Sequence, residues 1–294
     1  MLYIIANEKS GNGAAKRALF EITTYLTENH IPYAFDVSDY AGHSKELADR
    51  AIKDGRKDIV VIGGDGTISE VINGIAGRPA TVILISCGTG NDFVRMLDIP
   101  EGPLEAFRAQ LFGESRKIDV GRINDDYFLN ISGAGFDTEV LIQYEKFKHI
   151  SNGILPYMLG IFAALKNFRP LHIELEHDGI KTVRDVTIIS VGNGRFIGGG
   201  MMAVPTAEID DGLFDVVIAD KLNRLQIMQF LSKFIKGKHM DLPQIESFRC
   251  EKLTIACPHM TVESDGELKI MNSAKYEILP KALTIRCPKN PDPK

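Results

Sequence analysis

The chain has 294 residues, of which 44% are hydrophobic and 25% are charged, and its formal net charge is −5. This composition is ordinary for a soluble globular protein, and the length predicts about two domains. The acidic balance argues against a nucleic-acid-binding protein, because such proteins present an excess of basic side chains. No run reaches the roughly 18 apolar residues of a membrane-spanning helix, so we expect a cytoplasmic protein without a transmembrane segment. The widely spaced cysteines predict reduced thiols rather than a disulfide framework or a zinc site.

From Leu2 to about Phe112, short apolar runs alternate with helical patterns. The predicted strands are Leu2–Ala6, Tyr33–Val37, Ile59–Ile62 and Thr81–Ile85. The predicted helices follow the first glycine-rich loop, cover Ser44–Lys53, and begin at Ile68 and at about Phe93. Because helices separate these strands, the pattern predicts a parallel, doubly wound sheet.

The segment Gly63–Glu70 begins with three glycines around one aspartate, directly after a predicted buried strand. Glycines let backbone amides approach a phosphate where a Cβ would collide. Thr67 and Glu70 have the spacing of a helix capping box, which predicts a helix from Ile68 whose N-terminus would complete an anion site. The carboxylate of Asp65 would repel a bare polyanion, so it favours a nucleoside triphosphate with its metal ion. The alternative is a ligand-free turn between strand and helix.

Two further glycine-rich loops follow predicted strands: Asn7–Gly13 and Gly88–Asp92. The first lacks the Gly-Lys-Ser/Thr of a Walker A loop. The second, taken alone, could equally be a turn that caps a helix. The carboxyl ends of parallel strands meet at one edge of a sheet, and ligands bind at that edge. Three loops of one kind therefore favour a ligand site there.

After Glu114 the pattern changes to short strands with frequent turns, which predicts a mostly antiparallel sandwich or barrel and a domain boundary near residue 117. The predicted strands are Lys117–Ile123, Tyr127–Ser132, Leu171–Glu176, Val183–Val191, Leu213–Ile218, Leu253–Ala256, Met260–Ser264, Tyr276–Leu279 and Leu283–Cys287. Helices are predicted around Asp137–Phe147 and Ile154–Lys166 and within Asn223–Ile235.

Ile154–Leu165 is the most apolar stretch, and its basic flanking residues are Lys146, Lys148, Lys166 and Arg169. One interpretation is a buried helix that covers the second sheet. The other is an entrance for an acyl chain or a membrane-facing lip, since basic flanks suit anionic headgroups. The sequence does not separate the two.

Two acidic turns in the second half are candidates for chemistry. Asp210-Asp211-Gly212 is either a hairpin turn or a site for a hard cation, because clustered carboxylate and backbone oxygens suit magnesium or calcium. Asp265-Gly266-Glu267 is likewise either a common hairpin turn or the position of a catalytic base. A carboxylate beside a transferred phosphoryl group accepts the proton of the attacking hydroxyl in kinases.

Together these motifs resemble the bacterial soluble diacylglycerol kinase-like lipid kinases. Gly63-Gly64-Asp65-Gly66-Thr67 resembles the signature that diacylglycerol, sphingosine and NAD kinases share. Other motifs in family order narrow the resemblance: Gly88–Phe93, Ile118–Gly121, Asn130 with Gly133–Asp137, Asn193-Gly194 with Gly198–Gly200, Asp210–Gly212 and Asp265–Glu267. The match covers nearly the whole chain, and the Gly-Thr-Gly-Asn-Asp loop differs from the corresponding loop of NAD kinases.

The resemblance implies an α/β plus all-β fold, with a doubly wound α/β ATP-binding domain at residues 1–117. A C-terminal antiparallel β-sandwich that binds the lipid substrate would occupy residues 118–294, and its last residues could pack back on the first domain. The implied cofactors are ATP and Mg²⁺. The residues implied at ATP are Asn7, Ser10, Gly11, Ser38, Gly64, Asp65, Gly66, Thr67, Glu70 and Thr89. Those implied at magnesium are Asp211, backbone oxygens of Glu208 and Leu213, and Asp119.

The resemblance also implies the reaction and its base. Glu267 is the first choice for the proton acceptor and Asp265 the second, while Asp65 and Asp119 would link the nucleotide's metal to the protein. We expect transfer of the γ-phosphoryl group of ATP to a hydroxyl of diacylglycerol or a related lipid, in phospholipid metabolism. The alternatives are a kinase of NAD or another small soluble alcohol, and a non-catalytic lipid or nucleotide sensor.

The expected partner is a lipid substrate at the membrane surface, and no nucleic acid. The protein would be cytoplasmic, with peripheral contact at the inner membrane face as a further expectation. The sequence allows a homodimer and does not select an oligomeric state.

Overall fold

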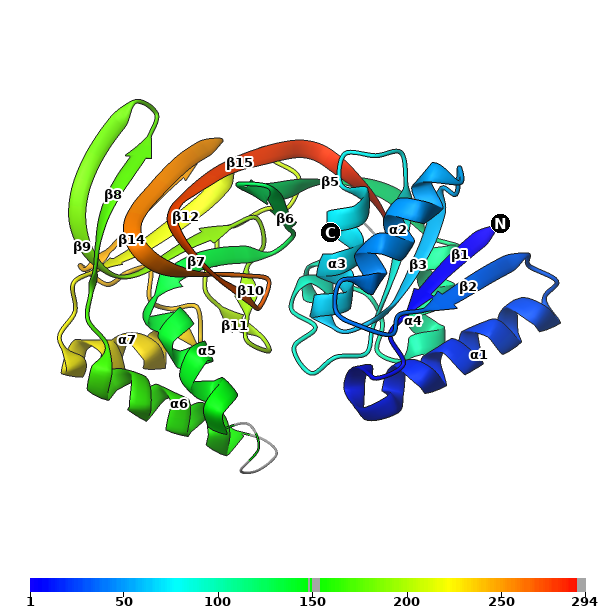
Figure 1. Ribbon diagram of the computed structural model, residues 1–294, viewed down its shortest axis with the longest axis horizontal. Helices are drawn as coiled ribbons and strands as arrows, with labels where there is room; N and C mark the ends of the chain where they lie inside the picture. Colours follow the sequence, from blue (N-terminus) through cyan, green and yellow to red (C-terminus); the bar gives the residue numbers. More distant parts are fainter. Residues whose placement is uncertain (148, 150–153, 290–294) are drawn as a thin grey trace.

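The computed structural model describes residues 1–147, 149 and 154–289. Two halves lie side by side, and β5 (Glu114–Ile123) and β15 (Glu267–Cys287) run between them (Figure 1). The first half is α/β and the second is mostly antiparallel β, as the sequence predicts. No helix in the described ranges is long and apolar enough to span a bilayer.

The first half is built on a parallel sheet with the strand order β2-β1-β3-β4. Its strands are β1 (Leu2–Ala6), β2 (Tyr33–Val37), β3 (Asp58–Gly63) and β4 (Thr81–Ser86). The helices are α1 (Ala14–Glu28), α2 (His43–Lys53), α3 (Asp65–Ile75) and α4 (Pro103–Leu111), with two 3-10 turns, η1 (Ser10–Gly13) and η2 (Phe93–Leu97).

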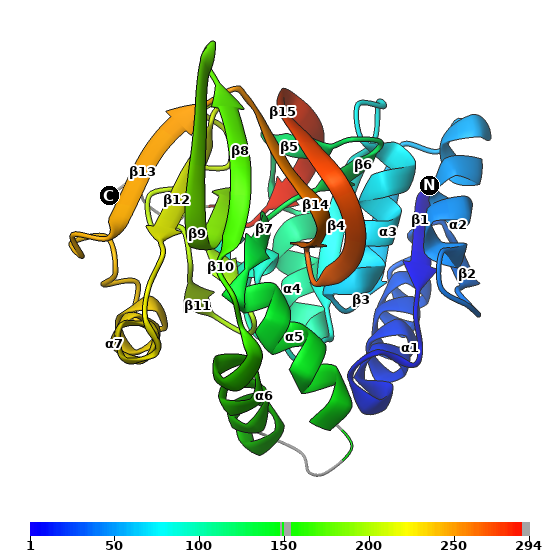
Figure 2. The same cartoon turned by 60° about the vertical axis from the view of Figure 1, so that its left-hand side comes forward.

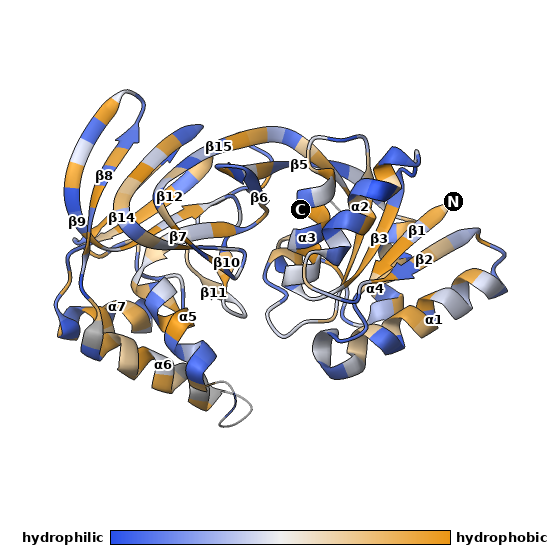
Figure 3. Ribbon diagram, in the orientation of Figure 1, coloured by the Kyte–Doolittle hydropathy of each residue, from blue (hydrophilic) through white to orange (hydrophobic). Residues whose placement is uncertain are grey.

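Helices cover both faces of this sheet, which explains why its central strands are apolar throughout (Figures 2 and 3). Val60 packs with α1 and α4 on one face, and its neighbour Val61 packs with α2 and α3 on the other. Successive strand residues point to opposite faces, so burial on both sides removes the usual polar alternation. The prediction of a doubly wound sheet is confirmed.

The second half is an antiparallel array that encloses one apolar core and carries helices on its other face. Its strands are β6 (Asp126–Phe128), β7 (Ile131–Gly135), β8 (Leu171–His177), β9 (Ile180–Gly192), β12 (Phe214–Asp220), β13 (Ile245–Cys250) and β14 (Lys252–Ser264), with a small hairpin of β10 (Phe196–Ile197) and β11 (Met201–Met202). The helices are α5 (Phe136–Phe147), α6 (Ile154–Asn167) and α7 (Arg224–Phe234) (Figure 1).

The long strand β15 joins the two halves into one hydrogen-bonded sheet. It pairs with β14 and β5 in antiparallel fashion, and near its end Thr284 and Ile285 pair in parallel with Thr81 and Val82 of β4. The C-terminal strand therefore extends the parallel sheet of the first half. The resemblance allows the last residues to pack back on the first domain, and the structure adds that they do so within a single sheet that spans both halves.

Local details also differ from the predicted elements. Helix α3 begins at Asp65 rather than Ile68, and the residues from Phe93 form a 3-10 turn rather than an α-helix. Helix α4 and strand β13 have no counterpart among the predicted elements. Strand β13 is an edge strand that pairs on one side only, so it is partly exposed. Its charged residues interrupt the apolar pattern by which strands are predicted from a sequence.

Candidate active site

The three glycine-rich loops meet at the carboxyl edge of the parallel strands, as in other sheets of this class. Asn7 Nδ2 donates to Thr67 Oγ1 at 3.3 Å, which links the first loop to the start of α3. A Cβ on Gly64 would lie 3.4 Å from the Cα of Gly88, so the second and third loops are in contact. A Cβ on Gly11 would overlap the carbonyl oxygen of Cys87. Glycine is required here for close packing of backbone on backbone.

A cavity of about 350 Å³ lies between the first two of these loops and the segment that follows β2. The residues predicted at ATP that line it are Asn7, Ser10, Ser38, Gly64, Gly66, Thr67 and Glu70. Gly11, Asp65 and Thr89, also predicted there, are not among its lining residues. The structure adds Lys9, Asp39, Tyr40 and Ala41. Lys9 lies in the first predicted loop, and its Nζ donates to the carbonyl oxygen of Asp39 at 3.0 Å.

The N-terminus of α3 faces this cavity without a side-chain cap. Gly64, the residue before the helix, is extended and has no side chain that could cap the first turn. The predicted capping box is wrong, because the Glu70 carboxylate instead accepts from the amides of Gly42 at 2.7 Å and Ser44 at 3.1 Å. Glu70 thus caps α2, a neighbour only in three dimensions. The uncapped amides of α3 and the helix dipole together favour a bound anion.

Asp65 joins the second loop to the third. Its carboxylate accepts from the amide of Asn91 at 2.8 Å and from the amide of Asp92 at 3.2 Å. Burial raises the pKa of Asp65, the amide of Asn91 lowers it, and the charge of Asp92 raises it further. A Cβ on Gly90 would come within 2.7 Å of the carboxylate, so this loop also depends on glycine.

Asp92 connects the two halves of the molecule across the site. Its carboxylate accepts from the amide of Gly199 at 3.0 Å and from the amide of Gly200 at 2.7 Å. Both glycines have positive φ, at 87° and 106°, a conformation that glycine adopts without a steric penalty in the turn between β10 and β11. Sequence reasoning gave Asp92 no role of its own, although the glycine run at Gly198–Gly200 stood out.

The turn between β14 and β15 places Asp265 and Glu267 differently. The Asp265 carboxylate accepts from the amides of Leu129 at 2.7 Å, Asn130 at 3.0 Å and Ile131 at 3.3 Å. Burial raises the pKa of Asp265 to about 6, against the opposing effect of these amides. Glu267 is exposed and has a different environment.

Glu267 lines a cavity of about 250 Å³ together with Lys45, Ser69 and Glu70. Glu70 and Ala41 line both this cavity and the cavity between the glycine loops, so the two adjoin. Glu267 and the first two glycine loops, which are about two hundred residues apart in the sequence, therefore line adjoining cavities. We refer to these two adjoining cavities as the crevice.

The residues predicted at magnesium lie near one turn but have other partners. The two oxygens of Asp119 accept from the amides of Gly212 and Lys281, each at 2.7 Å. Asp211 forms an ion pair with Arg249 and also accepts from the amide of Leu213 at 3.1 Å. Glu208 is exposed.

Each of these carboxylate oxygens already accepts from an amide or pairs with Arg249, and the magnesium role of these residues stays a prediction. In residues 1–147, 149 and 154–289, no group of three or more histidine, cysteine or acidic side chains is positioned to hold a metal ion. No step of the chemistry below is assigned to these residues.

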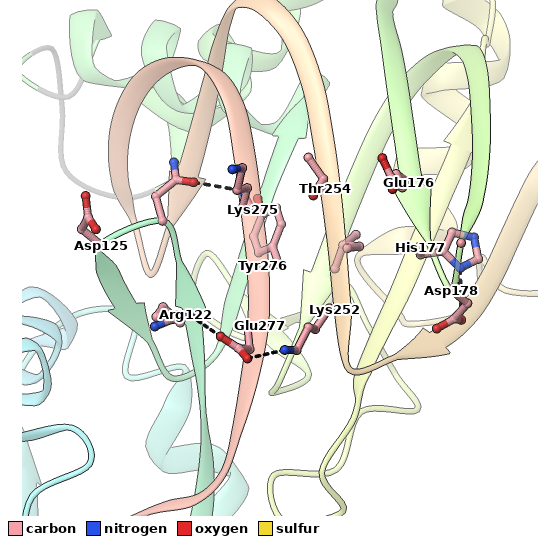
Figure 4. A pocket seen from close by; sticks show the side chains of 13 residues that line it. Arg122, Asp125, Glu176, His177, Asp178, Lys252, Thr254, Lys275, Tyr276 and Glu277 are labelled. Atoms are coloured by element: carbon pink, nitrogen blue, oxygen red, sulfur yellow. Dashed lines mark hydrogen bonds and ion pairs between the residues drawn. The ribbon is translucent and has the colours of Figure 1, made fainter.

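A third cavity, of about 740 Å³, lies on the outer face of the second half, and none of the predicted site residues line it (Figure 4). Among its charged side chains, Glu277 pairs with Lys252 at 2.7 Å and with Arg122. It has neither a glycine loop nor a helix N-terminus, so we do not assign it to the reaction.

The fold and the crevice define a class: a two-domain phosphotransferase with glycine loops for a nucleotide on one side and an acidic turn on the other. Two family models divide the chain in the same way. The diacylglycerol kinase catalytic domain matches residues 1–123, and the YegS C-terminal NAD kinase beta sandwich-like domain matches residues 130–287.

Individual proteins agree with this assignment. A diacylglycerol kinase of Bacillus subtilis strain 168 is 30% identical over 291 residues, covering 97% of this chain and 96% of that protein. One of Mycobacterium tuberculosis H37Rv is 29% identical over 293 residues, covering 97% and 94%. A diacylglycerol kinase crystal structure from Bacillus anthracis strain Sterne has the same fold, with a TM-score of 0.78 at 23% identity over 99% of this chain and 97% of that one. The chain belongs to the diacylglycerol kinase family and is a lipid kinase.

Proposed function

We propose that this lipid kinase transfers the γ-phosphoryl group of ATP to the free hydroxyl of diacylglycerol at a membrane surface. The observation that carries the proposal is the shared crevice, in which Glu70 lines both the cavity of the glycine loops and the cavity of Glu267. The names of the relatives support diacylglycerol as the acceptor.

The cavity of the glycine loops suits the triphosphate. The start of α3 lines it through Gly64, Gly66 and Thr67, and the two glycines allow a phosphate to approach the backbone. Lys9 adds a positive charge at the rim. These groups would stabilise charge that develops on the transferred phosphoryl group. We propose magnesium as the ion that accompanies ATP, since phosphate oxygens and water are its usual ligands in kinases.

Glu267 is the better candidate for the base. Asp265 accepts from three backbone amides, so its carboxylate is committed to holding the turn. Glu267 lies at the cavity wall, where a lipid hydroxyl could approach it. A base must come within hydrogen-bond reach of the proton that it removes.

Parallel assays with labelled ATP test the proposal. Purified protein is incubated with diacylglycerol, a sphingoid base or NAD, with and without Mg²⁺. We expect label in the organic phase with diacylglycerol and only in the presence of the metal. Label in the aqueous phase with NAD would instead support a kinase of soluble alcohols, and ATP binding without any product would support a sensor.

The helices of the second half offer a surface for membrane contact. Helix α6 buries Ile161, Ala164 and Leu165 against the sheet. Its exposed apolar side chains are Leu155, Met158 and Phe162, and those on or beside α7 are Leu225, Met228 and Ile235. The stretch Ile154–Leu165 is thus a core helix on one side and an exposed apolar strip on the other. The inner side agrees with the interpretation as a buried helix, and the exposed strip supports our proposal of membrane contact.

The charge around these helices suits an anionic bilayer. Residues 221–240 contain no acidic residue although the chain as a whole is acidic, and the exposed basic side chains there are Lys221, Arg224, Lys233, Lys236 and Lys238. Arg224 also donates to the carbonyl oxygen of Lys166 at 2.9 Å, which ties α7 to α6. Exposed Lys166 and Arg169 extend the basic area, and Lys148 lies outside the described residues. Apolar side chains beside basic ones are typical of peripheral membrane contact.

A double variant, Phe162→Glu with Leu225→Glu, tests this surface. We expect binding to vesicles rich in anionic lipid to fall at least about tenfold, because two apolar anchors are lost and two negative charges are added. The measurement is vesicle co-sedimentation. The control is Phe20→Glu on α1, a side chain that is 72% exposed and lies on the other half of the molecule. Equal losses in both variants, or none in the double variant, would contradict the assignment.

A further inference from the structure

Glu263 is a buried acid that the proposed reaction does not use. It lies on β14, just before the turn that carries Asp265 and Glu267, and its side chain is 2% exposed. Its Oε2 accepts from the amide of Gly266, the central residue of that turn, at 3.0 Å. Its Oε1 is buried and has no hydrogen-bond partner among the described residues. A buried acceptor without a donor costs free energy, so the second oxygen requires an explanation.

Asp137, in the first turn of α5, also has one buried carboxylate oxygen without a hydrogen-bond partner among the described residues. One of its oxygens accepts from the amide of Thr138 at 2.8 Å, and the other, Oδ2, is buried without a partner in the described part of the chain. Gly133 relates the two acids in space, because it pairs with Glu263 in the β7–β14 ladder. A Cβ on Gly133 would lie 3.5 Å from Asp137 Oδ2. Both carboxyls thus lie on the sheet face that α5 covers, with a glycine leaving room between them.

The surroundings of this pair are acidic or neutral. The charged and titratable groups that act on it come from three other elements: Asp265 of the β14–β15 turn, Asp92 of the loop after β4, and Tyr276 of β15. Burial, and next the charge of Asp137, raise the pKa of Glu263 well above its usual range. Burial raises the pKa of Asp137 to about 6. Two such carboxyls are not both ionised at neutral pH, whereas one proton between them satisfies both free oxygens.

We propose that Glu263 is a protonated positioning residue: its Oε2 holds the Gly266 amide, its Oε1 donates its proton to Oδ2 of Asp137, and the catalytic turn is thereby fixed. The inference rests on the proposed function only in naming that turn catalytic. The proton stays within the pair and does not enter the phosphoryl transfer. Loss of this proton would place a second negative charge beside Asp137, break the contact between Oε1 and Oδ2, and let the side chain that holds the turn shift.

Three variants test the inference. In Glu263→Gln the side-chain amide donates permanently, as the shared proton does, while its oxygen can still accept from Gly266. We expect near wild-type kcat at neutral pH. The loss of kcat that the wild type shows at alkaline pH should occur at a higher pH in this variant or be absent. Asp137→Asn leaves a donor and an acceptor in the pair, so it should behave in the same way. Glu263→Ala removes both contacts and should lower kcat about 10- to 100-fold with an unchanged KM for ATP.

Thermal unfolding against pH gives a reading that does not depend on activity. A carboxyl whose pKa is raised in the folded state binds more protons there than when unfolded. Its contribution to stability therefore falls as pH rises from the unfolded pKa of about 4.3 toward the folded value. Glu263→Gln removes this contribution, so its Tm relative to the wild type should rise with pH. Glu251→Gln, an exposed acid before the same strand, should show no such trend.

Each possible outcome either supports or contradicts the proposal. Wild-type kcat in Glu263→Ala would remove the positioning role. Equal loss in Glu263→Gln and Glu263→Ala would show that the ionised acid is required, which overturns the proposal. If Glu263→Ala does not fold, the two amide variants still decide, because parallel pH trends of Tm in Glu263→Gln and wild type would exclude a proton held by Glu263. An inactive wild type whose Tm difference follows the expected trend would reject the proposed function alone.

Discussion

A Glu267→Gln enzyme is expected to bind ATP with wild-type affinity and to phosphorylate diacylglycerol about 10²–10⁴-fold more slowly. The amide keeps the size and polarity of the side chain, but it does not accept the hydroxyl proton. Because Glu267 is exposed at the cavity wall, the substitution should leave the fold unchanged. Nucleotide titration followed by single-turnover kinetics separates the binding step from the chemical step.

Asp265→Asn is the informative comparison for this experiment. Its carboxylate accepts from three amides, and an asparagine oxygen cannot satisfy all of them while its NH₂ group faces donors. We expect Asp265→Asn to lose both activity and thermal stability, whereas Glu267→Gln should lose activity alone. Wild-type turnover in Glu267→Gln would remove it as the base. A stable but inactive Asp265→Asn would transfer that role to Asp265.

Gly11→Ala is expected to disrupt the nucleotide site and to weaken ATP binding at least about tenfold. Gly11 has a φ of 60°, and an added Cβ would overlap the backbone of Cys87 in the third loop. Left-handed strain costs an alanine about 1–2 kcal/mol. Relief of the overlap by separating the loops would add about 1–3 kcal/mol. Isothermal titration with ATP and thermal unfolding measure the two effects.

Gly13→Ala is the matched control, because Gly13 also has a positive φ, at 86°. A Cβ there would find its nearest neighbour at 3.9 Å, in the flexible side chain of Arg17. It should show the backbone strain without the collision, so ATP affinity should be nearly unchanged. Similar losses of affinity in both variants would mean that backbone strain alone, rather than the packing of the loops, explains the effect.

Asp92 shows why part of the site escaped prediction. Its carboxylate is held by the amides of Gly199 and Gly200, more than a hundred residues away in the sequence. Glu70 shows the same effect in the opposite direction: its spacing from Thr67 indicates a local cap, but the amides of Gly42 and Ser44 are its partners. Local spacing is informative only when no distant group offers a better hydrogen bond.

The sequence by itself determined the alternation of buried strands and helices, the change to antiparallel strands after Glu114, and the glycine loops. These follow from local rules: side-chain periodicity, β-branched residues and the freedom of glycine. The resemblance allows the last residues to pack back on the first domain, and the tertiary structure decided that they do so as part of β15, paired with β4. It alone decided that Asp119 and Asp211 accept from amides and that Asp211 pairs with Arg249. It also decided that Glu263 pairs with Gly133 across the sheet and that Asp137 lies beside the same glycine. Pairing partners across a sheet and the donors that reach a buried carboxyl depend on how distant segments pack, and no local pattern encodes them.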